Sequence, residues 1–95
     1  MLIEACIDDL LSAQTAIAGG ADRLELCASL SDGGTTPSHG RFAELLDAVT
    51  VPVFPIVRIR GGGFRYDDDE LRAMVRDTAH LAGLGVAGIV FGALN

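Results

Sequence analysis

Two cysteines and two glutamates alternate with aliphatic residues in short segments that read as β-strands. Glu4 and Cys6 lie in the first such segment, and Glu25 and Cys27 lie in the second. Successive side chains of a strand point to opposite faces, so each segment presents a thiol and a carboxylate on one face. Thiolates select soft ions such as Cu(I), and carboxylates serve as general acids or bases.

A third segment shows the same alternation with arginines. Arg58 and Arg60 alternate with Val57 and Ile59. The aliphatic set must meet the helix layer, because a charge buried there without a partner is costly. We therefore expect the polar set to point into a lumen, with two acids and two arginines as neighbours. That set is Glu4, Cys6, Glu25, Cys27, Arg58 and Arg60.

Each of these groups has a functional and a structural interpretation. Cys6 and Cys27 form a two-thiolate site for a soft ion, or they are two small buried residues that behave as hydrophobes. Arg58 and Arg60 bind a small anion with Glu4 or Glu25 as the acid–base carboxylate, or these charges form a structural ion-pair layer.

Two glycine-rich loops offer further anion contacts. The loop 33–38 ends in Ser38 before a helix, where backbone N–H groups hold an anion or only make a turn and a cap. The loop 61–63 beside Arg60 cradles a phosphate or simply connects two elements. His39, near the same mouth, is a candidate third metal ligand, whereas His80 is expected on the surface.

Apolar strand-like segments alternate with amphipathic helical ones along the chain. Thr36 and Pro37 fit a helix N-cap and first position, and Asp67 with Glu70 resembles a capping box. Helix faces are expected to bury Leu10, Ala13, Gln14 and Ile17, then Phe42, Leu45, Leu46 and Val49, then Leu71, Met74, Val75, Thr78 and Leu81. The predicted strands are 2–7, 23–28, 53–60 and 88–94, and the predicted helices are 9–18, a segment from Pro37 to about Val49, and about 69–82.

This order predicts a parallel sheet with right-handed crossovers. We interpret it as the N-terminal half of a TIM (β/α)₈ barrel, with a small doubly wound sheet as the alternative. A whole barrel takes about 250 residues, so residues 1–95 are expected to be one partial barrel domain, truncated after its fourth strand. The open edge of such a sheet favours pairing of two copies, a homo-oligomer.

Composition excludes several classes of partner. The chain is 49% hydrophobic and 21% charged, with a net charge of −6. This acidic balance argues against nucleic acid and anionic membranes as partners. The N-terminus shows no signal-peptide pattern, which predicts a cytoplasmic protein whose cysteines stay reduced.

Four stretches of the sequence together resemble the CutC family of copper homeostasis proteins. They are EACIDD, GGADRLELCASLSDGGTTPSHG, RIRGGGFRY and GIVFGALN, and they span essentially the whole chain. The resemblance implies a TIM barrel, a cytoplasmic location and a role linked to copper. It also implies that Cys6 and Cys27 match the proposed Cu(I) ligands of the family. An enzyme acting on a small anionic substrate is the alternative function.

Overall fold

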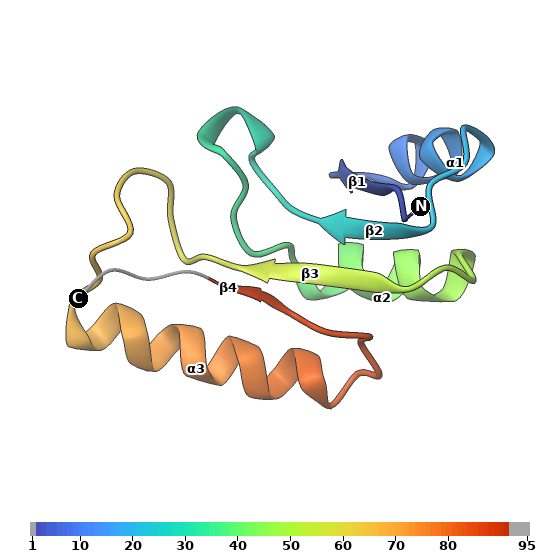
Figure 1. Ribbon diagram of the computed structural model, residues 1–95. Helices are drawn as coiled ribbons and strands as arrows, with labels where there is room; N and C mark the ends of the chain where they lie inside the picture. The colour runs from blue at the N-terminus through green and yellow to red at the C-terminus, as the bar shows by residue number, and fades with distance from the viewer. Residues whose placement is uncertain (1, 92–95) are drawn as a thin grey trace.

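The computed structural model describes residues 2–91 and shows strands and helices in regular alternation (Figure 1). A short 3₁₀ turn, Leu30–Asp32, lies in the loop that follows β2. The elements in chain order are β1 (Glu4–Ile7), α1 (Leu10–Ala18), β2 (Arg23–Leu26), α2 (His39–Ala48), β3 (Val53–Val57), α3 (Asp68–Ala82) and β4 (Val90–Phe91).

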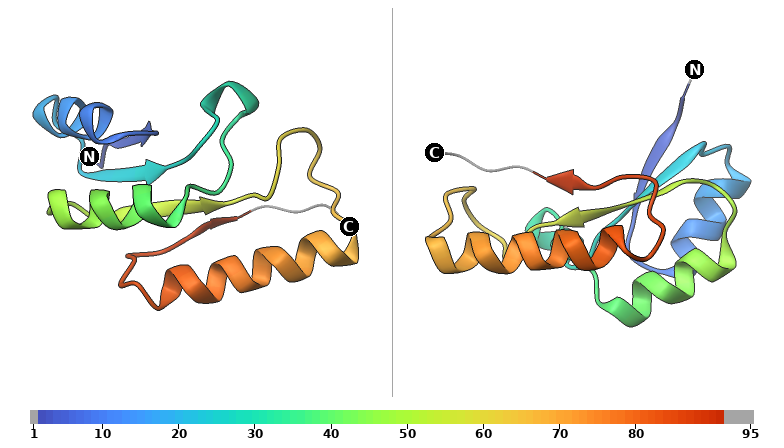
Figure 2. Two further views of the ribbon diagram at one scale, coloured as in Figure 1. Left: turned by 180° about the vertical axis from the view of Figure 1, so that it is seen from behind. Right: turned by 90° about the horizontal axis from the view of Figure 1, so that it is seen from below.

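The four strands form one parallel sheet in the order β1-β2-β3-β4. In its register Cys6 pairs with Glu25, and Ile56 pairs with Val90. Each strand thus lies beside the next one in sequence, as in the wall of a barrel, whereas a doubly wound sheet reverses its order. The three helices lie on the same side of the sheet (Figure 2). The fold is therefore the expected run of β/α units.

The aliphatic face of the sheet packs against the helices, as the alternation predicts. On the strands, Leu24, Leu26 and Val57 are fully buried, and on the helices Phe42 is fully buried too. Burial of apolar surface is the main force that holds these layers together. The core also contains Ile7, Ala13, Ala21, Leu45, Val53, Met74 and Leu81.

The start of α2 differs from the prediction at Thr36 and Pro37. The cap is Ser38, whose Oγ accepts a hydrogen bond from the Arg41 N–H at 3.1 Å. Thr36 instead bonds to Arg58, since its hydroxyl accepts from the Arg58 N–H at 2.8 Å. The capping box of α3 at Asp67 and Glu70 is confirmed.

The strands are shorter than predicted. β3 ends at Val57, so Arg58 and Arg60 lie in the outgoing loop, and Ile59 is 38% exposed instead of packing on helices. Ile3, which precedes β1, is 46% exposed. Of the predicted last strand, Val90–Phe91 is confirmed, and residues 92–94 lie outside the described part of the chain.

Three predicted inward side chains are exposed. Gln14 lies on the outer face of α1, and on α3 Leu71 is 37% and Val75 68% exposed. Met74 and Leu81 fill the contact with the sheet. The apolar stripe of α3 is therefore wider than the surface that β3 and β4 cover.

Candidate functional site

The Glu25 carboxylate lies between the two thiols. The Cys6 thiol donates to Glu25 Oε2 across the β1–β2 register at 3.6 Å, and the Cys27 thiol donates to Glu25 Oε1 at 3.8 Å. The alternation of β2 places Glu25 and Cys27 on the face opposite Leu24 and Leu26. We call Cys6, Glu25 and Cys27 the thiol cluster.

The loop after β2 covers one of these thiols. Cys6 is exposed, whereas Cys27 is only 3% exposed. Ala28 and Thr35 pair as an antiparallel bridge, which folds the loop back over the strand end. A Cβ at Gly34 would lie 3.1 Å from the Cys27 sulfur, and Gly34 has a φ of +96°. Only glycine meets both demands comfortably.

Both thiols are held in their protonated form. The pKa of Cys27 is raised from 9.0 to about 12, mainly by burial and next by the nearby Glu25 charge. Partial desolvation, followed by the Glu25 charge, also raises the pKa of Cys6. Neutral thiols that donate to a carboxylate are poor nucleophiles at neutral pH, so this cluster is not built for thiolate catalysis.

A cavity of about 300 Å³ opens beside Cys27 at the start of α2. Ser38, the predicted anion contact, lines it, although its hydroxyl oxygen already caps the helix. Arg41 and Asp8 add one charge of each sign to the wall. The cavity gives the buried sulfur an approach from outside.

Arg58 is held by backbone carbonyls. Its Nη1 donates to the carbonyls of Asp32 at 2.7 Å and Gly34 at 3.0 Å, and its Nη2 donates to that of Gly62 at 2.7 Å. The guanidinium also lies over the Phe64 ring, 4.8 Å from the centroid. Arg58 is 6% exposed, so it ties two loops together and does not offer a free clamp for an anion.

Arg60 is similarly engaged, with Glu70 of α3 and with its own loop. Its Nη2 donates to Glu70 Oε1 at 3.2 Å, and its Nη1 donates to the carbonyls of Gly61 and Gly63. The loop 61–63 therefore turns carbonyl oxygens toward the two arginines. An anion cradle needs N–H groups instead.

The expected neighbourhood of Glu4 and Glu25 with Arg58 and Arg60 is wrong. Glu4 pairs with Arg23, Oε2 to Nε at 2.7 Å, and Arg58 and Arg60 take the partners described above. The reason is that β3 ends at Val57, and strand alternation does not extend into the loop beyond it. Arg23 was missed, although it lies two residues before Glu25 on the same face.

The two histidines meet each other rather than the thiol cluster. His39 Nδ1 lies 3.0 Å from His80 Nε2, and both side chains are exposed. The surface position of His80 is thus confirmed. His39 thus contacts His80 instead of Cys6 or Cys27, and within residues 2–91 no group of three His, Cys, Asp or Glu side chains has an arrangement suited to hold a metal ion.

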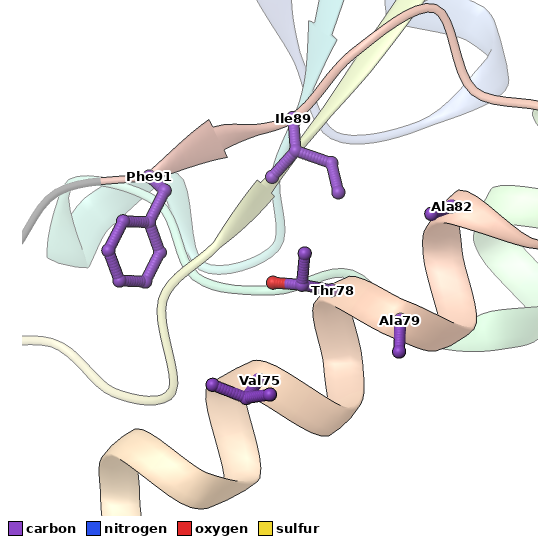
Figure 3. Close-up of a pocket in the computed structure, with 6 residues that line it drawn as sticks. All are labelled: Val75, Thr78, Ala79, Ala82, Ile89 and Phe91. Atoms are coloured by element: carbon purple, nitrogen blue, oxygen red, sulfur yellow. The ribbon is translucent and has the colours of Figure 1, made fainter.

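A second cavity, of about 560 Å³, lies between α3 and β4 (Figure 3). Its walls are almost entirely apolar, with Val75 from the helix and Phe91, which is 53% exposed, from the strand. The other lining residues are Thr78, Ala79, Ala82 and Ile89. This groove carries no group that could perform chemistry, and it differs in that respect from the thiol cluster.

The consecutive β/α units are those of a barrel-type protein. Two thiols lie close together near the C-terminal ends of its first two strands. The chain belongs to the CutC family, whose model matches residues 1–95. It is 56% identical to a CutC family protein of Mesorhizobium japonicum and 48% identical to the human copper homeostasis protein cutC homolog, over 99% of this chain in both cases. The chain spans 36% and 34% of the length of these two relatives.

A solved structure shows the same arrangement. The crystal structure of a CutC protein from Streptococcus agalactiae matches the whole chain with a TM-score of 0.91 at 33% identity. This chain covers 47% of that protein. The parallel β/α fold and the family follow from these matches. Among residues 2–91, no helix has the length and apolar character needed to cross a membrane.

Proposed function

We propose that this protein binds Cu(I) through Cys6 and Cys27 and serves copper homeostasis in the cytoplasm. The observation that carries the proposal is the Glu25 carboxylate, which accepts from both thiols at 3.6 and 3.8 Å. Thiolates select Cu(I) over harder cations, and the cytoplasm keeps cysteines reduced. Family membership and the name of the human relative support the link to copper.

Binding must release protons because both thiols are neutral at rest. One Cu(I) ion and two thiols give a dithiolate complex and two protons. Glu25 is the first acceptor in reach of each S–H. Because the pKa of each thiol is raised, protons compete strongly with copper. The apparent affinity should rise by up to about 100-fold for each pH unit while two protons are released.

Competition with a Cu(I) chelator under anaerobic conditions tests the proposal. The chain should bind one Cu(I), and Cys6→Ser, Cys27→Ser and the double variant should each weaken that binding. Ser31→Ala is a control, since the Ser31 side chain is exposed and lies outside the thiol cluster. Unchanged stoichiometry and affinity in a folded double variant would refute the thiol site.

A second candidate is an enzyme or binding protein for a small anion. The observation in its favour is the cavity beside Cys27, where Arg41 and Ser38 face a space of about 300 Å³. The carboxylate in the wall of this cavity is Asp8, and the predicted acid–base residues Glu25 and Glu4 are not among the residues that line it. A thermal-shift screen of small phosphates and carboxylates tests this, and ligand shifts that survive Arg41→Ala would exclude the cavity as their site.

The exposed α3–β4 groove suggests a homo-oligomer of the 95-residue chain. Phe91 and Val75 leave apolar surface uncovered beside β4, the outermost strand of the sheet formed by the described residues, and unpaired strands pair readily. Size-exclusion chromatography with light scattering should show a dimer. Val75→Lys should yield monomer, and a wild-type monomer would contradict this proposal without touching the copper site.

A further inference from the structure

We propose that His39 and His80 form a bidentate site for a tetragonal divalent metal ion, of which Ni²⁺ and Cu²⁺ are the class. The two side chains come from different helices, His39 from the start of α2 and His80 from near the end of α3. Their ring nitrogens are 3.0 Å apart. This site is separate from the thiol cluster and would take a harder ion.

The imidazole rings of His39 and His80 contact each other through their nitrogen atoms and not through their flat faces. The ring centroids are 5.1 Å apart and the planes are tilted by 54°, so the rings are not stacked. Without metal, one nitrogen donates a proton to the lone pair of the other. If the protons move to the far nitrogens, His39 Nε2 and His80 Nδ1, both near nitrogens present lone pairs to one ion.

The spacing allows both nitrogens to bind one ion. Zinc–imidazole bonds are about 2.0–2.1 Å long, and other first-row divalent ions are similar. At such lengths, nitrogens 3.0 Å apart subtend an angle of about 94° at the metal. That is close to adjacent positions of a square-planar or octahedral ion, and small rotations of the exposed rings also reach the separation of about 3.3 Å that a tetrahedral ion needs. Nitrogen and oxygen ligands in tetragonal geometry suit Cu²⁺ and Ni²⁺.

The exposure of the two histidines and their number in the chain also favour a metal site at His39 and His80. Both histidines are exposed, so water can complete the coordination sphere. The chain has only these two histidines, and imidazole is a better ligand for these ions than a carboxylate is. A bound ion would clamp α2 to α3, and it would stabilise the folded chain in proportion to its occupancy.

Nickel titration of tag-free protein tests the site, because Ni²⁺ does not oxidise thiols. The parent is the Cys6→Ser/Cys27→Ser variant, which removes the thiol cluster and makes failure here independent of the copper proposal. Calorimetry at neutral pH should show one Ni²⁺ per chain and a raised unfolding temperature. His39→Gln and His80→Gln should each weaken binding at least about tenfold.

A rearranged variant provides the matched control. His80→Gln with Arg72→His keeps two histidines but moves one of them two helical turns, about 12 Å, along α3. It should bind no better than His80→Gln alone. Equal affinity of the parent and this variant would overturn the proposal, as would the absence of saturable binding in the parent.

A spectroscopic measurement on the folded parent alone does not depend on how the histidine variants fold. Electron paramagnetic resonance of one equivalent of bound Cu²⁺ should show coupling to two imidazole nitrogens. Coupling to one nitrogen or none would overturn the bidentate site.

Discussion

Gly33 and Gly34 are neighbours in the chain, and the Gly34 carbonyl also accepts from Arg58, yet the Cα atoms of the two glycines face different side chains. A Cβ at Gly33 would lie 3.0 Å from Nη1 of Arg58, and one at Gly34 would lie 3.1 Å from the sulfur of Cys27. The arginine has partners for both Nη groups in three backbone carbonyls. The thiols share a single carboxylate. Groups whose bonds are met within the protein hold its shape, and groups that share one partner are available to a ligand.

Substitution of Arg58 should have the largest effect on the stability of the folded chain. Arg58→Met removes the donor of three backbone carbonyls, one of them that of the buried Gly34, which should lower the free energy of unfolding by about 3–4 kcal/mol. Urea denaturation measures this. Arg65→Met is the control, because the Arg65 side chain is exposed and its change should stay within about 0.5 kcal/mol. A loss of the same small size at Arg58 would show that its carbonyl bonds are not structural.

Substitutions of Gly33 and Gly34 should have similar effects on stability but different effects on Cu(I) binding. Gly33→Ala and Gly34→Ala each force a side chain into a φ of +87° or +96°, which should cost about 1–3 kcal/mol in unfolding. Only Gly34→Ala should also weaken Cu(I) binding, because it displaces the Cys27 sulfur. Chelator competition in both variants checks this, and equal affinities would mean that the loop does not position the thiol.

Alkaline pH should destabilise the thiol region. The pKa of Cys27 is raised from 9.0 to about 12 in the folded chain, so its contribution to stability is complete below pH 9 and is lost as the pH rises toward 12. Unfolding free energies across this range should fall more steeply for the wild type than for Cys27→Ala. Parallel curves would show that Cys27 does not titrate late.

The Glu25 charge should have the smallest effect. Glu25→Gln removes its contribution to the raised pKa of Cys6 while the larger effect of desolvation remains. Alkylation of Cys6 at neutral pH, measured with Cys27→Ser present in both proteins, should accelerate by about tenfold or less. Glu44→Gln is the matched control, since Glu44 is exposed on α2 and does not contribute to the raised pKa of Cys6. A slower reaction would contradict the charge effect.

Sequence patterns predicted the fold well because they depend on local chemistry. Alternation placed Leu24 and Leu26 on the helix side and Glu25 and Cys27 on the other, and the structure confirms it. The order of elements and the capping box of α3 were likewise readable.

The errors arose where a strand ended or where a partner was distant in sequence. Arg58 and Arg60 kept their alternation in the sequence, but β3 stops at Val57 and the loop sets their directions. The pairing of His39 with His80 joins residues 41 positions apart. No local pattern encodes such a contact, which depends on how far α3 is shifted along the sheet.

X-ray absorption at the copper edge tests the central claim most directly. The wild-type chain, loaded with one equivalent of Cu(I) without oxygen, should show two sulfur neighbours and no imidazole nitrogen, and Cys6→Ser/Cys27→Ser should lose that signal. A first shell of nitrogen and oxygen in the folded wild type would contradict the account.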